Sequence, residues 1–234
     1  HKIHSVNNIN NRDDSLLFKI GCVCNNATLN SESQIGDPTE IALLFSAKKY
    51  GLNLYKTKNN YKRVDEIPFD SVRKMMSVIV KDNNKEVMFS KGASDVILDL
   101  CTHILDNGTR RKLTEKDIAK LKRFQNMMTN DALRVLGFAY KDINQNEHLS
   151  EYGLTFVGFQ GMMDPPREEV KQSIKEAHSA GIKVIMITGD HVETAKAIGE
   201  LVGIKGNFLE GKELNFMSDS KLRKVVEETA IFAR

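Results

Sequence analysis

Residues 183–190, which read K-V-I-M-I-T-G-D, constrain the fold of this chain more than any other stretch. Four consecutive large apolar residues, two of them β-branched isoleucines, closed by a glycine, are typical of a strand buried on both faces of a parallel sheet. Amphipathic helix patterns flank this strand at residues 168–180 and 193–202, and each ends before a glycine. Helix, strand and helix with short connections predict an α/β repeat.

In α/β folds, ligands bind outside the carboxyl ends of the strands. Thr188, Gly189 and Asp190 lie at that end of the predicted strand. A hydroxyl beside a bare main-chain amide is suited to holding a transferring phosphoryl group. We therefore expect phosphate chemistry at these three residues.

The composition excludes several classes of protein. The 234 residues, 41% of them apolar, are enough for two modest domains. Basic and acidic residues number 34 and 31, and no basic stripe with interleaved aromatic residues is present, so nucleic acid is not an expected partner. The apolar stretches are too short to span a bilayer and no signal peptide opens the chain, so we expect a soluble chain.

Cysteines and histidines give no sign of a metal or redox site. The three cysteines are an odd number, and C-V-C at Cys22 and Cys24 is not a redox C-x-x-C motif. Reduced cysteines of a cytosolic domain are the expected state. The six histidines are scattered along the chain, which argues against a metal cluster.

The segment I-G-D-P-T-E precedes a helical apolar pattern, so Asp37 is predicted as the N-cap and Pro38 as the first helical residue. Glu40 then lies in the first turn. Spacing alone leaves two interpretations open: Glu40 complements the helix dipole, or it faces a ligand. D-P-T also imitates the D-x-T of aspartyl-phosphate enzymes, but polar residues rather than an apolar strand precede it.

Strands are predicted at residues 61–68, 74–81 and 85–89, with the last two forming a hairpin. The third strand runs directly into S-K-G-A, which places Lys91 and Gly92 at a strand-to-helix joint. A cation and a bare main chain at a helix N-terminus suit an anionic or purine ligand. A lone K-G is a weak signal, and from these residues alone an exposed lysine at a strand end is the favoured alternative.

A helix at residues 113–128 and strands at 134–140 and 154–159 complete an α+β pattern that extends to Met163. Two prolines then interrupt it, and the α/β pattern follows. The last predicted strand, 231–233, ends the chain in a way that suggests truncation. Residues 206–213 have P-loop spacing, but Glu213 replaces the Ser or Thr that holds Mg²⁺ and no buried strand is expected before them.

Seven motifs occur in order along the chain: G-D-P-T-E, P-F-x-x-x-R-K-M-M-S-V, F-S-K-G-A, A-L-R-V-L-G-F-A-Y, G-M-M-D-P-P-R, M-I-T-G-D and I-F-A-R. Together they resemble the cytosolic part of type II P-type cation-transporting ATPases. The similarity covers residues 16–234 and is closest to the calcium-pump branch, in a bacterial version.

The resemblance implies a fold class that is both α/β and α+β. Residues 1–163 would be an α+β nucleotide-binding (N) domain with an antiparallel sheet. Residues 164–234 would be a truncated, partial phosphorylation (P) domain of the haloacid-dehalogenase-like, Rossmann-type parallel α/β class.

The resemblance also implies roles in nucleotide binding for residues of the first domain. The aromatic ring that matches Phe69 stacks on adenine, and the carboxylate that matches Glu40 contacts the adenine edge. Lysines that match Lys74 and Lys91 line the adenine and triphosphate pocket, and Gly92 follows with its bare main chain.

Further roles fall nearer the reacting phosphate. In the family, the arginine that matches Arg134 reaches the phosphates, and the one that matches Arg167 lies at the hinge beside the ribose. Thr188, Gly189 and Asp190 match the catalytic loop that receives the γ-phosphate.

The chain departs from the family pattern in three places. Ser71 stands where related pumps often carry a phosphate-binding arginine, so phosphate binding would depend more on Lys74 and Arg134. The D-K-T-G-T segment with the phosphorylated aspartate is absent, as is the T-G-D-G-x-N-D segment that helps to hold Mg²⁺. We therefore expect the chain to bind ATP weakly, with an incomplete Mg²⁺ site, and to be catalytically inactive.

The parent enzyme implied by the resemblance is an ATP hydrolase and cation translocase. Its partners would be ATP, the transported cation (calcium is favoured) and membrane lipid, with this chain at the cytosolic face of the membrane. Two alternatives are a non-catalytic nucleotide-binding module and a stand-alone dehalogenase-type phosphatase. The second is disfavoured because it needs its own strand-presented D-x-D motif.

Overall fold

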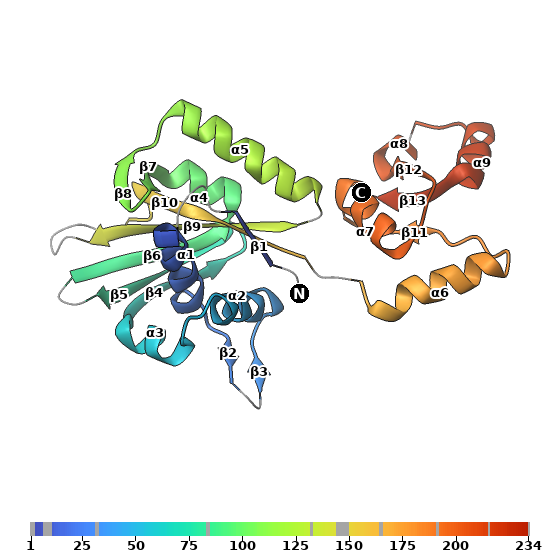
Figure 1. Cartoon of the computed structure of the whole chain (residues 1–234). Helices are drawn as coiled ribbons and strands as arrows, with labels where there is room; N and C mark the ends of the chain where they lie inside the picture. Colours follow the sequence, from blue (N-terminus) through green and yellow to red (C-terminus); the bar gives the residue numbers. More distant parts are fainter. Residues whose placement is uncertain are drawn as a thin grey trace. The chain divides into compact units, whose positions relative to one another are not determined.

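The computed structural model describes residues 3–6, 11–30, 33–82, 85–131, 133–143, 150–163, 166–190, 192–214 and 216–233. It is a mixed α/β protein that divides into two compact units (Figure 1). The larger unit comprises Ile3–Gln125 and Val135–Met162, and the smaller is chiefly Met163–Arg234 together with Asn126–Arg134.

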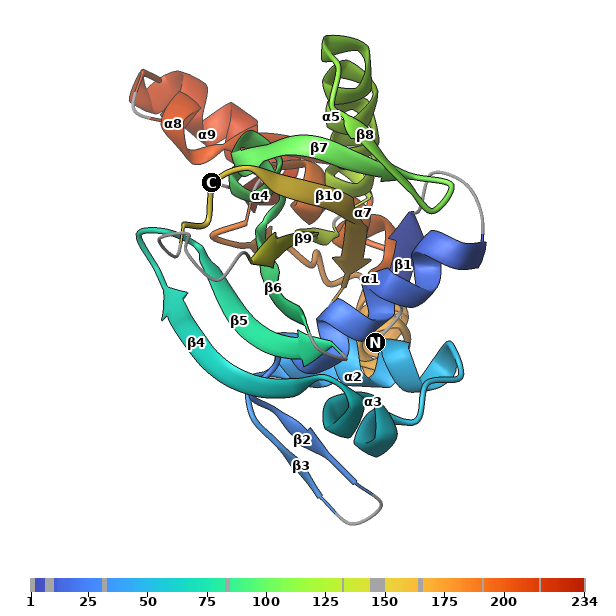
Figure 2. The same cartoon turned by 90° about the vertical axis from the view of Figure 1, so that its left-hand side faces the viewer.

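The larger unit is built on an eight-stranded, mostly antiparallel sheet (Figure 2). Seven strands follow the order β4-β5-β6-β9-β10-β7-β8, and β1 pairs with β10 outside this order. β7 and β10 run parallel, whereas β4 to β5, β5 to β6 and β6 to β9 are antiparallel. The strands are β1 (Ile3–Val6), β4 (Lys62–Asp70), β5 (Met75–Asp82), β6 (Lys85–Ala93), β7 (Cys101–Asp106), β8 (Thr109–Lys112), β9 (Arg134–Ile143) and β10 (Leu154–Met162).

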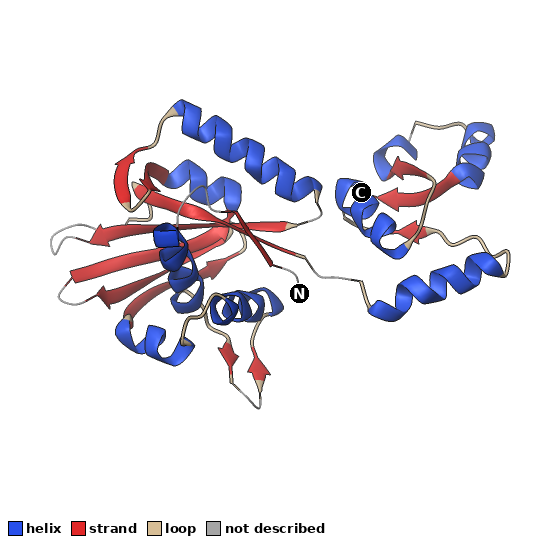
Figure 3. Ribbon diagram, in the orientation of Figure 1, coloured by secondary structure: helices blue, strands red, loops and turns tan. Residues whose placement is uncertain are grey.

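Helices cover both faces of this sheet, and Figure 3 shows them in blue against the red strands. On one face, Leu17 and Ile20 of α1 pack on Val78, Phe89 and Phe138. On the other face α4 lies so close that a Cβ added at Gly137 would be 2.9 Å from Cβ of Ile97. The larger unit contains the helices α1 (Asn11–Val23), α2 (Pro38–Lys49), α3 (Leu54–Asn60) and α4 (Ser94–Leu100), and most of α5 (Glu115–Asn130).

Most sequence-based assignments in this unit are confirmed. The predicted strands at 61–68, 74–81, 85–89, 134–140 and 154–159 correspond to β4, β5, β6, β9 and β10, and the predicted helix at 113–128 corresponds to α5. The middle of the hairpin turn between β5 and β6 lies outside the described residues. The β7–β8 hairpin was missed although Asn107 and Gly108 form its turn with φ of 54° and 79°. Asn-Gly is the pair that such a turn requires, so the signal was present. The sequence also missed the short hairpin of β2 (Thr28–Leu29) and β3 (Gln34–Ile35).

The smaller unit contains a three-stranded sheet, order β11-β13-β12, in which both pairs are parallel. Its apolar core joins Ile174 of α6, Ala195 of α7 and Ile231 of β13. Its elements are α6 (Glu168–Ser179), β11 (Met186–Ile187), α7 (Val192–Val202), β12 (Asn207–Glu210), α8 (Gly211–Leu214), α9 (Asp219–Glu228) and β13 (Thr229–Ala233).

The prediction of a long strand at 183–189 buried on both faces is wrong. The strand β11 has two residues and lies at the edge of its sheet, with Ile187 80% exposed and Ile185 40% exposed. The central strand is β13, because it pairs with both β11 and β12. The segment with P-loop spacing, residues 206–213, contains the strand β12, which was not predicted because polar residues lie at its two ends.

Candidate functional site

The turn between β4 and β5 is held by hydrogen bonds to Asp70. The Oδ1 atom of Asp70 accepts from the amides of Val72 at 2.9 Å and Arg73 at 2.8 Å, and these bonds lower the pKa of the Asp70 carboxyl. The carbonyl of Asp70 accepts from the amide of Lys74 at 2.6 Å. Lys74 has a φ of 56°, in the left-handed region. The turn leaves Lys74 exposed and the ring of Phe69 62% exposed.

Strand register brings this turn against Gly92. Asp70 lies opposite Met75, Met75 opposite Gly92 and Gly92 opposite Gly137. A Cβ added at Gly92 would be 2.5 Å from Cβ of Met75 and 2.6 Å from the carbonyl oxygen of Lys74. Glycine is therefore required here because the neighbouring main chain occupies the space of a side chain. Lys91 and Gly92 lie within β6, whereas the sequence placed them at the joint with the helix.

Lys91 is buried and paired with Glu40. Its Nζ atom is 2.6 Å from Oε1 of Glu40, and the residue is 6% exposed, so the alternative of an exposed lysine is wrong. The amide of Asn26 donates to the other carboxylate oxygen at 3.1 Å, and the Asn25 side chain donates to the Glu40 carbonyl at 2.9 Å. The partner of Lys91 is thus itself held by the turn that follows α1.

The start of α2 positions Glu40 as the sequence predicted. Asp37 is the N-cap and accepts from the amide of Thr39 at 2.8 Å, and Pro38 is the first helical residue. Glu40 lies in the first turn, where a carboxylate complements the helix dipole. The same carboxylate also pairs with Lys91.

Arg134 is the first residue of β9 and is exposed. Leu136 lies opposite Ala93, so Arg134 begins its strand beyond the last residue of β6. This is the end of the sheet that also carries the β4–β5 turn. One end of the large sheet therefore gathers Phe69, Lys74, Lys91, Gly92 and Arg134, and Glu40 reaches it from α2.

The remaining predicted residues belong to the smaller unit. Arg167 is exposed and immediately precedes α6. Thr188, Gly189 and Asp190 follow β11, and the Thr188 amide donates to the carbonyl of Phe232 at 3.0 Å. The Thr188 hydroxyl donates to Oδ2 of Asp190 at 2.7 Å, and it accepts from the Asp190 amide at 3.1 Å. The side-chain bonds of this loop are therefore local.

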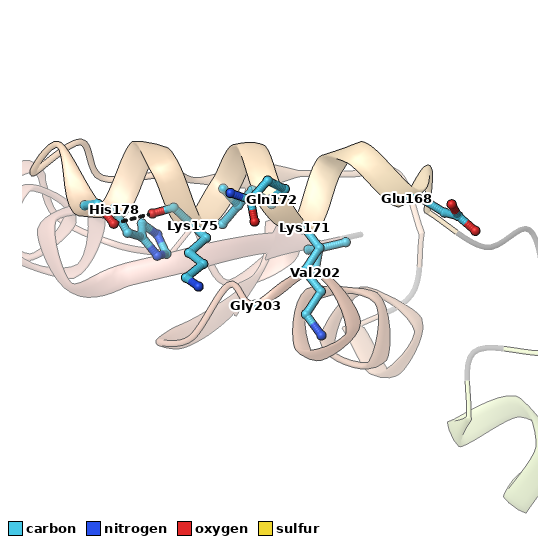
Figure 4. Close-up of a pocket in the computed structure, with 9 residues that line it drawn as sticks. Glu168, Lys171, Gln172, Lys175, His178, Val202 and Gly203 are labelled. Atoms are coloured by element: carbon cyan, nitrogen blue, oxygen red, sulfur yellow. Dashed lines mark hydrogen bonds between the residues drawn. The ribbon is translucent and has the colours of Figure 1, made fainter.

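Two hollows are lined by residues other than those predicted for the site. An open groove of about 740 Å³ in the smaller unit follows α6 and reaches the end of α7, and Figure 4 shows Lys171 and Lys175 extending from α6 toward Gly203. A smaller pocket of about 290 Å³ lies at the end of α1. Its two cations, Lys58 and Arg63, donate to main-chain carbonyls there, at 3.1 Å to Ala27 and 2.9 Å to Val23. The Arg63 bond caps the carboxyl end of α1, and the Lys58 bond holds the segment that follows the helix.

Sequence reasoning missed a polar network on the opposite face of the sheet from Lys91. Arg73 forms an ion pair with Glu151, whose Oε1 atom accepts from the Ser77 hydroxyl at 2.7 Å. Ser77 and Ser90 are fully buried and their hydroxyls are 2.7 Å apart. No local sequence signal reveals this network, because 78 positions separate Arg73 from Glu151.

The described part of the chain holds no group of three His, Cys, Asp or Glu side chains that would bind a metal ion. The three cysteines are free and buried, as expected for reduced thiols. Burial raises the pKa of the Cys22 and Cys24 thiols to about 11, so both stay protonated at neutral pH. Among the described helices, none has the length and apolar character needed to cross a bilayer.

Comparison with known proteins identifies the family. Residues 15–169 match the family model described as P-type ATPase, cytoplasmic domain N. A calcium-transporting ATPase of Bacillus cereus is 43% identical over 234 residues, which cover 97% of this chain and 26% of that protein. Calcium-transporting ATPases of Bacillus subtilis and Listeria monocytogenes are 40% and 39% identical, over 98% and 93% of this chain and 27% and 26% of their own length. The chain thus spans about a quarter of these relatives, and it belongs to the P-type ATPase family.

Proposed function

We propose that residues 1–163 form a nucleotide-binding domain that takes ATP at the end of the large sheet. The observation that carries this proposal is the register of β4, β5, β6 and β9. It brings an exposed aromatic ring at Phe69, cations at Lys74 and Arg134, and the buried Lys91–Glu40 pair to one sheet end. Family membership supports the same conclusion.

Each group suits a different part of a nucleotide. The exposed ring of Phe69 offers a face on which a purine stacks. Lys91 and Glu40 present an N–H donor and a carboxylate acceptor 2.6 Å apart, and the edge of adenine carries both an acceptor and a donor. Because the charge of Lys91 is balanced by Glu40, attraction for the phosphates depends mainly on Lys74 and Arg134.

We further propose that residues 164–234 are part of a haloacid-dehalogenase-like phosphorylation domain. The parallel order β11-β13-β12 supports this proposal, with Thr188, Gly189 and Asp190 at the carboxyl end of β11. These three residues would receive the γ-phosphate of ATP, and Arg167 would lie at the hinge beside the ribose. The nucleophilic aspartate would come from a part of the parent protein that this sequence does not contain.

The parent protein would couple transfer of the ATP γ-phosphate to transport of a cation across a membrane, with this chain on the cytoplasmic side. Relatives named as calcium-transporting ATPases favour calcium. Mg²⁺ would accompany ATP in the parent, but the described residues contain no cluster that would hold it. Because the nucleophilic aspartate is not part of this sequence, this chain alone would bind nucleotide without hydrolysing it.

Titration of the chain with ATP, followed by amide chemical shifts, tests the proposal. We expect weak, millimolar binding, because part of the triphosphate site is missing, and shifts centred on Phe69, Lys74 and Lys91. Phe69→Ala should reduce affinity about tenfold through loss of stacking. Tyr55→Ala is the matched control because Tyr55 is also an exposed aromatic residue, 77% exposed, on α3. Equal affinities for the two variants, or no shifts at millimolar ATP, would contradict the proposed site.

A further inference from the structure

We propose that the Arg73–Glu151 ion pair is a clamp that fixes the turn at residues 69–74 in the shape that receives the nucleotide. This inference rests on the function proposed above and adds two positioning residues to it. Neither residue needs to contact ATP, since they act through the main chain that carries Phe69 and Lys74.

The guanidinium of Arg73 spans the whole turn. One terminal nitrogen binds the carboxylate of Glu151. The other donates to the carbonyl of Pro68 at 2.5 Å and to that of Met75 at 3.2 Å. These carbonyls come immediately before Phe69 and immediately after Lys74, so a single side chain joins the two ends of the nucleotide-facing segment.

Glu151 anchors the clamp to the interior of the sheet. Its side chain is 16% exposed, and its second oxygen accepts from the hydroxyl of Ser77. Ser77 lies opposite Ser90 in the β5–β6 ladder, and both are fully buried. Because these hydroxyls are buried on strands that are paired on both sides, they hold the carboxylate at a fixed position, and the carboxylate holds Arg73.

Two features of the turn favour an external support in addition to its own bonds to Asp70. Lys74 has a φ of 56°, which is unfavourable for a residue with a side chain. Phe69 is 62% exposed and therefore is not fixed by burial of its ring. A recognition element of this kind binds more tightly when it is pre-organised, because less conformational entropy is lost on binding.

Arg73→Met tests the clamp, with Arg111→Met as the matched control. Arg111 forms ion pairs with Asp106 and Asp117 in another part of the same unit, and its side chain is 39% exposed against 32% for Arg73. We expect Arg73→Met to weaken ATP binding about tenfold. It should also accelerate hydrogen exchange at the amides of Val72 and Lys74. Arg111→Met should change neither quantity, although both variants lose an ion pair.

Two further variants guard against a general loss of fold. Arg73→Lys keeps the charge but loses the planar fork that reaches several acceptors, so its ATP affinity should lie between those of wild type and Arg73→Met. Glu151→Gln keeps an acceptor for Ser77 while removing the charge, and it should show the same intermediate loss. Both should retain the amide shifts of the folded chain.

The outcomes separate this inference from the function on which it rests. If Phe69→Ala weakens ATP binding but Arg73→Met binds like wild type, the clamp is overturned while the nucleotide site stands. If Arg73→Met and Arg111→Met weaken binding equally, the effect is one of stability and the clamp is also overturned. If wild type shows no ATP binding, the proposed function fails and the clamp fails with it.

Discussion

The end of the large sheet that carries Lys91 and the loop after β11 are built in opposite ways. At the first, Lys91 is 6% exposed and is held by Glu40, 51 positions away along the chain. At the second, Thr188 and Asp190 bond each other across two positions, and the adjoining Ile187 is 80% exposed. One region depends on long-range buried contacts, whereas the side chains of the other form local bonds at a sheet edge.

This difference predicts how strongly substitutions in each region change folding stability. A group held by distant, buried partners cannot be changed without disturbing the unit that positions it. A local loop at an edge strand is free to change at little cost to folding, which suits a loop that we propose completes its site with another part of the parent. The following predictions test this contrast, from the largest expected effect to the smallest.

The largest effect is expected for Lys91→Met. Removing the cation leaves the Glu40 carboxylate without its charged partner, and loss of one member of a buried pair costs about 3 kcal/mol or more. In the smaller unit, Lys196 pairs with Glu193 at 2.9 Å and lies 3.5 Å from the centre of the Phe208 ring, but these side chains are more exposed. Lys196→Met should cost about 1 kcal/mol or less.

Urea unfolding monitored by amide signals of each unit measures both variants. Similar losses in the free energy of unfolding for Lys91→Met and Lys196→Met would contradict the proposed difference between buried long-range pairs and local pairs.

A pair of glycines gives the next effect. An added methyl at Gly92 would lie within 2.6 Å of the Lys74 carbonyl oxygen, so Gly92→Ala should cost about 2–3 kcal/mol through overpacking against main chain. At Gly189 a Cβ would meet nothing within 4 Å, and Gly189→Ala should stay within about 0.5 kcal/mol of wild type. Chemical denaturation of the two single variants is the measurement. A fully stable Gly92→Ala chain with normal ATP binding would show that the close approach at this sheet end is not required.

A stabilising change is expected at Gln160. Its side chain is fully buried in β10, and neither its amide nitrogen nor its oxygen bonds any described residue. An unsatisfied buried amide is costly, and Met has a similar volume, so Gln160→Met should add about 1 kcal/mol to the free energy of unfolding. Gln172→Met is the control, since Gln172 is exposed on α6. The only effect of this substitution should be loss of the 2.8 Å bond to Glu176. A less stable Gln160→Met would show that the amide is satisfied within the native protein.

Local elements were predictable because their signals lie within a few residues. The Asp37 cap and Pro38 set the start of α2, and the apolar spacing of α5 identified that helix. Burial of the stretch at 183–189 was not predictable in the same way. An apolar run is buried only if its strand has covered neighbours, and the order β11-β13-β12 leaves Ile187 at the edge.

The candidate site was predictable in its residue types but not in its pairings. The motifs identified Phe69, Lys74 and Lys91, whereas the partner of Lys91 emerged only from the packing of α2 beside β6. The role of Arg73 was not predicted, because strand register and turn shape determine its partners. These are Glu151 and the carbonyls of Pro68 and Met75. Sequence alone carries no periodic signal for such contacts.

An effect no larger than that at Gln160 should come from a charge network whose members lie within a few residues, like the bonds of the loop after β11. Asp117 binds Arg111 at 2.6 Å and accepts from the amide of Thr114 at 3.0 Å at the start of α5. The Arg111 guanidinium, followed by the Thr114 bonds, lowers the pKa of Asp117. Because the folded-state pKa is lowered, the stability that the Asp117 carboxylate contributes is fully present above the unfolded pKa, about 3.9. It is lost as pH falls through the folded pKa.

Asp117→Asn should therefore cost about 1 kcal/mol at neutral pH, the scale of a helix cap, and the difference in stability between the variant and wild type should shrink in acid. Urea midpoints between pH 7 and about pH 3 measure this dependence. A difference that stayed constant across that range would mean that the carboxylate charge contributes nothing, and a loss as large as that of Lys91→Met would remove the distinction between local and long-range partners.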